Sequence, residues 1–184
     1  MTGRGTLVLV VGPSGAGKDS IIAGAAARLR GDPRIVFARR VVTRPADASG
    51  EDHIAVSPAE FAGLRNADGL LLHWTAHGLD YGLPALLATA LDEGRAVVAN
   101  VSRTVVAEAR IRLAPVQIIA VEASHETLAA RLAARGRETA ADIAARLARS
   151  GALAPTDADT VIANDGTLDD AVERFAAALR GLVD

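Results

Sequence analysis

The chain has 184 residues, of which 50% are hydrophobic, 23% charged and only 3% aromatic, with a formal net charge of -2 at pH 7. This balance indicates one folded domain with an aliphatic core and excludes disordered, collagen-like and membrane-spanning chains. The near-neutral charge argues against nucleic acid and membrane surfaces as partners, and the absence of cysteine excludes disulfides and thiol catalysis.

A glycine-rich loop separates the first predicted strand from the first predicted helix. The apolar run over residues 6–11 indicates a buried parallel strand, and it is too short for a signal or membrane segment, so we expect a cytoplasmic protein. Residues 20–29 are rich in Ala, Ile and Leu and indicate a helix. A loop in this context directs its amides at phosphate, as in a Walker A loop, although an ordinary glycine-rich turn is the alternative. We assign to ATP binding the run Gly12-Pro13-Ser14-Gly15-Ala16-Gly17-Lys18-Asp19-Ser20.

Lys18 is the only lysine among the 20 basic residues, and all the others are arginine. Its compact ammonium group suits a tight site, so we expect Lys18 to bridge the β- and γ-phosphates of a nucleotide. The usual pattern has Ser or Thr after this lysine, whereas this chain has Asp19 and then Ser20. A carboxylate is a good oxygen ligand for Mg²⁺, and we hypothesise that Asp19 binds it directly or through water. The alternative is that Asp19 only favours the helix dipole.

An arginine cluster follows in the segment Arg39-Arg40-Val41-Val42-Thr43-Arg44. Arg40 and Arg44 are four residues apart and can hold a phosphate group through paired hydrogen bonds, although a solvated surface cluster is the alternative. A strand is expected near residues 35–42, either completing the main sheet or leading into a separate lobe. The next polar segment is Gly50-Glu51-Asp52-His53-Ile54-Ala55-Val56-Ser57.

The middle of the chain holds its only tryptophan, Trp74, and its only tyrosine, Tyr81. We expect Trp74 in the core, whereas the Tyr81 hydroxyl can reach a polar ligand. His53, His73 and His77 lie in the same part of the chain, but their spacing is not that of a metal-binding helix and no cysteine joins them. A polar wall for the substrate explains these histidines better than a zinc site.

The second half of the chain alternates strands and helices. A strand over residues 97–101 leads into a turn that holds Asn100, Ser102 and Arg103, and further strands are predicted over 116–122 and 160–163. Ser124 is a suitable N-cap for a helix that runs to the segment Arg131-Leu132-Ala133-Ala134-Arg135-Gly136. A second arginine-rich segment, Arg146-Leu147-Ala148-Arg149, follows, and as bare sequence these arginines could equally be solvated. The last strand ends at the turn Asn164-Asp165-Gly166. The segment Thr167-Leu168-Asp169-Asp170 is similar to a capping box at the start of the closing helix, which is expected over 171–182.

Together these motifs resemble the guanylate-kinase-like branch of the nucleoside monophosphate kinases, over nearly the whole chain. The resemblance implies a three-layer α/β P-loop fold with a parallel core (residues 1–33, 91–134 and 151–184), an acceptor-binding lobe (34–90) and a lid (135–150). It implies catalytic roles at the nucleotide phosphates for Lys18, Arg131, Arg135 and Arg146, and an adenine-side position for Asn164. It also implies that Arg40, Arg44 and Tyr81 grip the acceptor phosphate, in a lobe that includes His53.

Departures from the guanylate kinase pattern bear on the acceptor. The resembled enzymes carry an acidic residue where this chain has His73, and an Asp-x-Asp pair where it has Asn100 and Ser102. Guanine N–H groups left without these acceptors would cost about 1–3 kcal/mol each, so we expect GMP to be a poor substrate. The chain resembles instead a branch of this group that phosphorylates a ribose bisphosphate. The resemblance rests on these replacements, on the Gly-Lys-Asp-Ser loop and on the short spacer between Thr43-Arg44 and Glu51-Asp52-His53-Ile54. That resemblance implies ATP-dependent transfer to the sugar 1-phosphate, with Arg103 as the candidate for the 5-phosphate.

Phosphorylating a phosphate needs no general base, because the acceptor oxygen is already anionic at neutral pH. Catalysis should come from positioning and from cations, namely Mg²⁺, Lys18 and the arginines. Two other functions remain open: a nucleoside monophosphate kinase, and a non-catalytic binding module. The second is disfavoured because Gly17 and Lys18 are retained. The sequence leaves the donor preference and the oligomeric state open.

Overall fold

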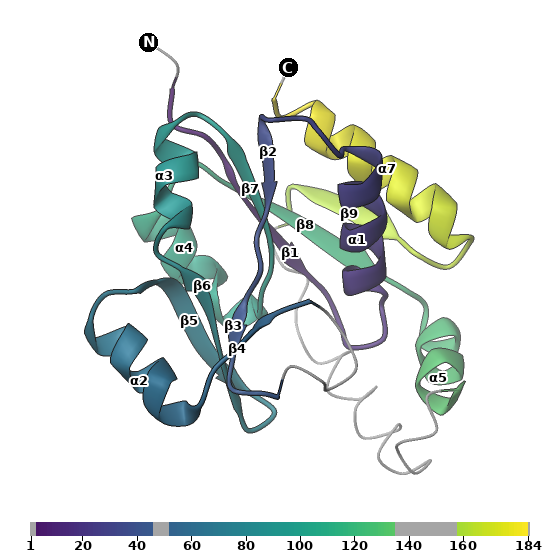
Figure 1. The fold of residues 1–184 in the computed structure, drawn as a ribbon. Coiled ribbons are helices and arrows are strands. Elements are labelled where there is room, and N and C mark those ends of the chain that lie inside the picture. Colours follow the sequence, from purple (N-terminus) through teal and green to yellow (C-terminus); the bar gives the residue numbers. More distant parts are fainter. Residues whose placement is uncertain (1–2, 46–51, 135–157, 184) are drawn as a thin grey trace.

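The structure is a computed structural model that describes residues 3–45, 52–134 and 158–183 (Figure 1). Its main sheet has five strands, all parallel, in the order β2-β7-β1-β8-β9. This confirms the α/β class with a parallel sheet. The strands are β1 (Leu7–Val11), β2 (Ile35–Phe37), β7 (Ala96–Asn100), β8 (Val116–Glu122) and β9 (Thr160–Ala163).

Helices cover both faces of this sheet because β1 is apolar on both sides. Val8 and Val10 belong to a cluster with Ile21 of α1 and Phe175 of α7, whereas Leu9 packs among residues of the opposite face. Since side chains alternate along a strand, a continuous apolar run requires cover on each side. The covering elements are α1 (Lys18–Arg28), α5 (His125–Ala134) and α7 (Leu168–Arg180) on one face, and α3 (Leu87–Asp92), η1 (Arg103–Val105) and α4 (Val106–Arg112) on the other.

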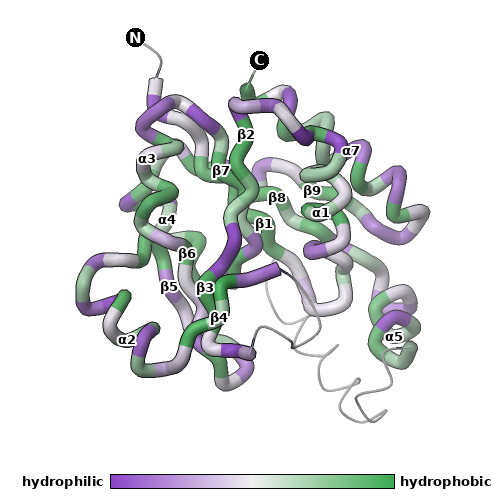
Figure 2. The backbone as a smooth tube through the Cα atoms, in the orientation of Figure 1, coloured by the Kyte–Doolittle hydropathy of each residue, from purple (hydrophilic) through white to green (hydrophobic). Residues whose placement is uncertain are grey.

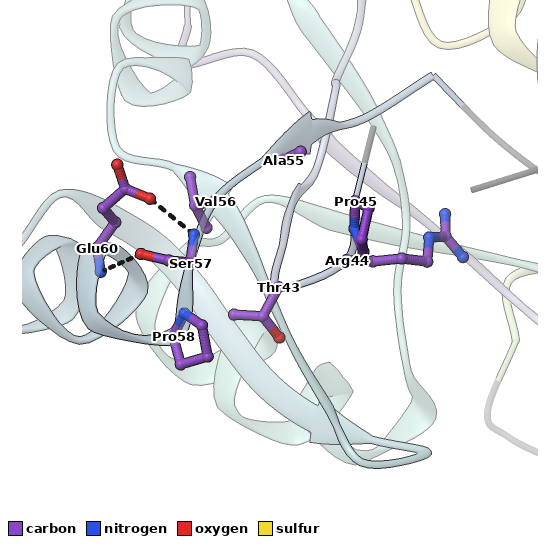
Figure 3. Close-up of a pocket in the computed structure, with 8 residues that line it drawn as sticks. All are labelled: Thr43, Arg44, Pro45, Ala55, Val56, Ser57, Pro58 and Glu60. Carbon is purple, nitrogen blue, oxygen red and sulfur yellow. Dashed lines mark hydrogen bonds between the residues drawn. The ribbon is translucent and has the colours of Figure 1, made fainter. Parts of the chain in front are cut away.

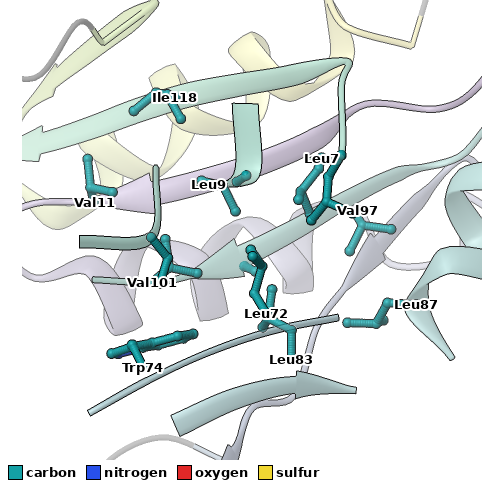
Figure 4. Packing of buried hydrophobic residues seen from close by; sticks show 14 of the residues in the cluster. Leu7, Leu9, Val11, Leu72, Trp74, Leu83, Leu87, Val97, Val101 and Ile118 are labelled. Atoms are coloured by element: carbon teal, nitrogen blue, oxygen red, sulfur yellow. The ribbon is translucent and has the colours of Figure 1, made fainter. Parts of the chain in front are cut away.

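A second, four-stranded sheet packs against the main one. Its order is β4-β3-β6-β5, with β3 and β4 parallel and the other pairs antiparallel. Leu72, Trp74 and Leu83 face the main sheet and share one apolar cluster with Leu9 and Val101 (Figure 4). Burial of each such side chain contributes about 1.5–3 kcal/mol. The elements are β3 (Val41–Val42), β4 (Ile54–Ala55), α2 (Pro58–Asn66), β5 (Leu70–Ala76) and β6 (Leu79–Pro84).

The boundary of the lobe differs from the expected range of 34–90. The single strand predicted near 35–42 is divided, because β2 completes the main sheet and β3 opens the second one. Helix α3 packs against β7 and therefore belongs with the main sheet. The second sheet and α2 thus span residues 41–84. The predicted lid over 135–150, with Arg135 and Arg146, lies outside the described residues, as does the stretch 151–157 assigned to the core.

Hydropathy follows this layering, with the strands of the main sheet apolar and the outer turns polar (Figure 2). Helix α7 begins at Leu168, and the Thr167 hydroxyl caps it by accepting a hydrogen bond from the Asp170 amide (3.1 Å), as expected for the capping segment before the helix. The Ser124 hydroxyl accepts from the Thr127 amide (3.2 Å), as expected for the start of α5. Among the described residues, no helix is both long enough and apolar enough to cross a membrane.

Candidate active site

Part of the predicted site gathers at one edge of the main sheet, where its parallel strands end. Gly12 follows β1, Asn100 ends β7, Ser124 follows β8 and Asn164 follows β9. In open α/β sheets ligands bind in the crevice beyond the carboxyl ends of the strands. This edge, and not the sheet faces, therefore forms the candidate active site.

The phosphate loop requires glycine at its two ends. Gly12 has a φ of 147°, and a Cβ there would lie 2.1 Å from the Val121 carbonyl oxygen. Gly17 has a φ of 90°, and a Cβ there would lie 2.5 Å from Nδ2 of Asn164. Within the described part of the chain no side chain caps the start of α1, where Gly17 is the N-cap. The amides of this first turn are thus oriented for an anion.

Lys18 folds over the loop that precedes it. Its ammonium Nζ donates hydrogen bonds to the carbonyl oxygens of Gly12 (2.8 Å) and Pro13 (3.0 Å). Phosphate oxygens carry full negative charge and form stronger hydrogen bonds with an ammonium than carbonyls do. A phosphate seated in the loop can therefore engage Lys18 without a large movement of its side chain.

Asn164 supports the phosphate loop through a buried hydrogen bond. The family resemblance implies an adenine-side position for this residue. In the structure Asn164 is 2% exposed and its Nδ2 donates to the Ala16 carbonyl (2.7 Å). Its backbone amide donates to Glu122 at the end of β8 (2.8 Å). Asn164 thus connects the ends of β8 and β9 to the phosphate loop. In the sequence, the only signal for this role was the position of Asn164 directly after the last strand.

Arg131 reaches the same loop from α5. One guanidinium nitrogen, Nη2, donates to the Asn164 carbonyl (2.9 Å), and the other, Nη1, is buried without a hydrogen-bond partner among the described residues. That Nη1 lies 3.9 Å from where a Cβ on Gly17 would stand. An unpaired buried N–H costs about 1–3 kcal/mol, so this donor suits an incoming phosphate oxygen.

Asp165 anchors the start of α5, from which Arg131 projects. Its Oδ1 accepts a hydrogen bond from the Ser124 amide (2.7 Å). This bond, followed by hydrogen bonds with the Thr127 and Ser124 hydroxyls, holds the pKa of Asp165 below its usual value. The carboxylate therefore stays charged at neutral pH and keeps β9 attached to α5.

Asn100 contacts Asp19 across the site. Nδ2 of Asn100 donates to Oδ1 of Asp19 (2.6 Å), and this contact joins the end of β7 to the first turn of α1. The sequence predicts Asn100 in substrate binding, whereas here one of its donors is used within the protein. No group of three or more His, Cys, Asp or Glu side chains in the described ranges could hold a metal ion.

Arg40, Tyr81 and Trp74 form a stack on the lobe. Trp74 and Tyr81 are cross-strand neighbours on β5 and β6, and their rings are parallel within 6° with centroids 5.6 Å apart. The Arg40 guanidinium lies 5.1 Å from the Tyr81 centroid and 6.0 Å from that of Trp74. Such cation–π contacts contribute about 0.5–2 kcal/mol. The structure thus brings Arg40 and Tyr81 together, with the buried Trp74 as their platform.

The three histidines of this segment do not lie on one wall. His53 is buried and contacts Arg44, whereas His73 is exposed on β5 and alternates with the buried Leu72 and Trp74. His73 therefore lies on the strand face opposite the stack of Arg40, Tyr81 and Trp74. His77 occupies the turn between β5 and β6 with a φ of 53°.

Ser102 and Arg103 lie just beyond the end of β7, after Val101. The Ser102 hydroxyl caps η1, accepting from the Thr104 amide (3.3 Å) and the Thr104 hydroxyl (2.9 Å). Nε of Arg103 is buried without a hydrogen-bond partner among the described residues. Arg103 is thus fixed at its backbone and retains a donor for an anion.

A pocket of about 320 Å³ lies elsewhere on the lobe (Figure 3). The Ser57 and Glu60 side chains at one side of it form a capping box for α2, and these hydrogen bonds lower the pKa of Glu60. Arg44, a predicted acceptor residue, lines this pocket, whereas no phosphate-loop residue does, so we place the phosphoryl transfer itself at the strand ends. The lining residues are Thr43, Arg44, Pro45, Ala55, Val56, Ser57, Pro58 and Glu60.

The parallel sheet, the phosphate loop and its lysine define a protein of the P-loop kinase class. The chain belongs to the guanylate kinase family, whose model matches residues 4–182. Membership of this kinase family implies ATP as the co-substrate. A guanylate kinase from Anaplasma phagocytophilum has a similar fold, with a TM-score of 0.68 and 21% identity over 99% of this chain and 87% of that chain.

Two curated relatives are each named ribose 1,5-bisphosphate phosphokinase PhnN. The one from Acidiphilium cryptum is 54% identical over 97% of this chain and 94% of its own length. The one from Methylobacterium radiotolerans is 50% identical over 96% of this chain and 98% of its own. A bifunctional ribose 1,5-bisphosphokinase-thymidine phosphorylase from Cupriavidus necator is 49% identical over 98% of this chain, which spans only 30% of that relative.

Proposed function

We propose that the protein transfers the γ-phosphoryl group of ATP to the 1-phosphate of ribose 1,5-bisphosphate, giving 5-phosphoribosyl 1-diphosphate and ADP. The names of relatives at 54% and 50% identity over nearly their whole length support this reaction. The observation that favours a sugar over guanine is at the end of β7, where Asn100 contacts Asp19 and Ser102 caps η1. Neither side chain offers a carboxylate to the N–H groups of a base.

The chemistry asks the protein to bring two polyanions together. An oxygen of the 1-phosphate forms a bond to the γ-phosphorus while the bond from that phosphorus to the β,γ-bridging oxygen breaks, and ADP leaves. The attacking oxygen carries no proton to remove, so positioning and charge neutralisation suffice. Lys18 and Arg131 act on the donor phosphates, and we extend this role to Arg135 and Arg146.

The side chains at the N-terminus of α1 are chemically suited to bind Mg²⁺. Asp19 and Ser20 are exposed there and offer hard oxygen ligands beside Lys18. Mg²⁺ commonly takes only one or two protein ligands and fills its shell with water and phosphate oxygens, which agrees with the absence of a larger ligand cluster in the described residues. When bound, the ion would neutralise charge on the β- and γ-phosphates. Asn100 orients the Asp19 carboxylate.

The acceptor side supplies cations at two ends of a sugar bisphosphate. Arg40, held over the Tyr81 ring, and Arg44 serve the 1-phosphate, with the Tyr81 hydroxyl as a further donor. Arg103 serves the 5-phosphate through its unpaired guanidinium donor. His73, predicted to bind the substrate, lies on the opposite strand face and receives no role at the acceptor in this proposal.

The first test is ADP release with ATP and Mg²⁺ and a panel of acceptors: ribose 1,5-bisphosphate, ribose 5-phosphate, GMP, AMP, CMP and UMP. Product mass identifies the phosphorylated compound. We expect strong turnover only with the bisphosphate. Strong turnover with a nucleotide would overturn the assignment in favour of a nucleoside monophosphate kinase. A ligand at 100 times its Kd raises the free energy of unfolding by about 2.7 kcal/mol, so bound ATP should raise the melting temperature. If ATP with Mg²⁺ neither reacts nor raises the melting temperature, the protein is a non-catalytic module.

Arg103→Ala should raise the KM for the bisphosphate about ten- to a hundredfold, because a charge-assisted hydrogen bond to phosphate contributes about 1.5–3 kcal/mol. The KM for ATP should change little. Steady-state kinetics with each substrate varied in turn measures both constants. Arg112→Ala, which removes an exposed arginine from the neighbouring α4, is the matched control and should alter neither KM. Equal increases in the two constants for Arg103→Ala would defeat the assignment.

Asp19→Ser should increase the Mg²⁺ concentration needed for half-maximal turnover about tenfold, since it removes the carboxylate that binds the ion directly or through water. A titration of turnover with Mg²⁺ at fixed ATP measures this. Asp169→Ser, at the first turn of α7, removes a similar exposed carboxylate and should leave the titration unchanged. Unchanged Mg²⁺ dependence and turnover in Asp19→Ser would assign Asp19 to the helix dipole alone.

A further inference from the structure

His53 contacts Arg44 at two points. The histidine directly precedes β4, is only 6% exposed, and its Nε2 lies 3.1 Å from the Arg44 carbonyl oxygen. Its Nδ1 lies 3.4 Å from Nη2 of the Arg44 guanidinium. One ring therefore contacts both the backbone and the side chain of Arg44.

The chemistry of the partners defines the protonation of the ring. A carbonyl oxygen only accepts, so Nε2 of His53 must carry a proton and donate it to Arg44. A guanidinium only donates, so Nδ1 must accept from Nη2. The contact therefore requires the neutral ring with its proton on Nε2. The shorter backbone bond fixes the Arg44 main chain, and the longer, weaker one orients the guanidinium.

The backbone around His53 is held as well. The Arg39 guanidinium donates to the His53 carbonyl oxygen (3.3 Å) and forms an ion pair with Asp52 (2.7 Å). The amide of Ile54, the next residue, donates to the Arg40 carbonyl (2.8 Å). These hydrogen bonds connect the backbone at the start of β4 to Arg39 and Arg40, the two arginines before β3.

Arg44 keeps a donor for an anion in this arrangement. Its Nε is buried and has no hydrogen-bond partner among the described residues, although Nη2 faces His53. A guanidinium whose orientation is fixed loses less entropy when it binds phosphate than a mobile one. The position of Arg44 is therefore set before the acceptor arrives.

We propose that His53 is a positioning residue that orients Arg44 toward the acceptor phosphate, rather than a group that contacts the substrate. The proposal rests on the proposed function, because it takes Arg44 as a phosphate ligand. It predicts that His53 affects binding of the acceptor and leaves binding of ATP unchanged.

The test compares His53→Leu with His53→Gln in steady-state kinetics with ATP and the acceptor varied separately. His53→Leu loses both contacts and should raise the acceptor KM about tenfold with an unchanged ATP KM. His53→Gln places an amide N–H near the position of Nε2 and should restore most of the loss. His125→Leu, an exposed histidine on α5, is the matched control.

A double-mutant cycle separates positioning from a structural role. In an Arg44→Ala background, His53→Leu should raise the acceptor KM no further, because the residue through which it acts is gone. Additive effects, equal losses in the Gln and Leu variants, or parallel rises in both KM values would overturn the proposal. If His53→Leu does not fold, the acceptor KM of His53→Gln is compared with that of His53→Asn instead. The Asn variant should have the higher KM, since its amide is too short to reach the Arg44 carbonyl. Wild-type turnover in the same assay tests the proposed function separately, and the KM comparison uses whichever acceptor the wild type phosphorylates.

Discussion

Lys18→Met is expected to lower kcat by at least about 10²–10³-fold, the usual loss when a preorganised group that stabilises transition-state charge is removed. Lys18 is the only lysine of the chain, and its ammonium already lies over the loop at the Gly12 and Pro13 carbonyls. Methionine is unbranched like lysine and keeps most of the side-chain length without the charge. Single-turnover ADP release with saturating ATP and acceptor measures the effect on the chemical step.

Two controls make this result specific. Arg65→Met removes one exposed positive charge from α2 and should leave kcat unchanged. Lys18→Arg keeps the charge but is expected to remain strongly impaired, because the planar guanidinium cannot take the place of a compact ammonium in a tight loop. The expected loss of kcat would be contradicted if Lys18→Met kept more than about a third of the wild-type kcat. That result would mean that this loop does not act on the transferred phosphoryl group.

Gly17→Ala is expected to destabilise the protein by about 2–5 kcal/mol and to abolish stabilisation by ATP. The first cause is the left-handed backbone, with a φ of 90°, which costs a residue with a Cβ about 1–2 kcal/mol. The second is overlap with Nδ2 of Asn164, 2.5 Å from the new Cβ, which breaks the hydrogen bond to Ala16. Urea unfolding with and without ATP measures both effects.

Gly31→Ala is the matched control for this variant. Gly31 has nearly the same φ, 91°, but a Cβ there meets nothing within 4 Å. It should therefore show only the backbone cost, about 1–2 kcal/mol, and keep the response to ATP. If the two variants lose equal stability and both respond to ATP, the contact between Asn164 and the loop does not hold the nucleotide site together.

The main sheet and the phosphate loop could be predicted from the sequence because their signals are local. The strand Val116–Glu122 holds an apolar run over residues 118–121 that is buried on both faces, and it was predicted with the bounds that the structure has. The loop from Gly12 to Lys18 is likewise defined by glycines at positions where the backbone needs them. Each signal lies within about ten residues, so no tertiary contact is needed to interpret it.

The acceptor lobe was harder to predict because its strands are short. Residues 35–42 looked like one strand, but β2 and β3 join different sheets, and three residues between them redirect the chain. His73 was placed on the substrate wall from its neighbourhood in sequence, yet a step of one residue along β5 turns its side chain away from Trp74 and Tyr81. Sequence proximity on a strand therefore did not indicate a shared face.

The sequence by itself determined the class of fold, the phosphate loop and its lysine, and the absence of the acidic residues expected for guanine. These are matters of residue type and local spacing. Only the tertiary structure decided which side chains meet: Asn164 under the loop, Asn100 on Asp19, Arg40 over Tyr81, and His53 on Arg44. Each of these contacts joins segments from different strands or helices, and its existence depends on strand order and on the direction of side chains at strand ends, which periodicity alone does not specify.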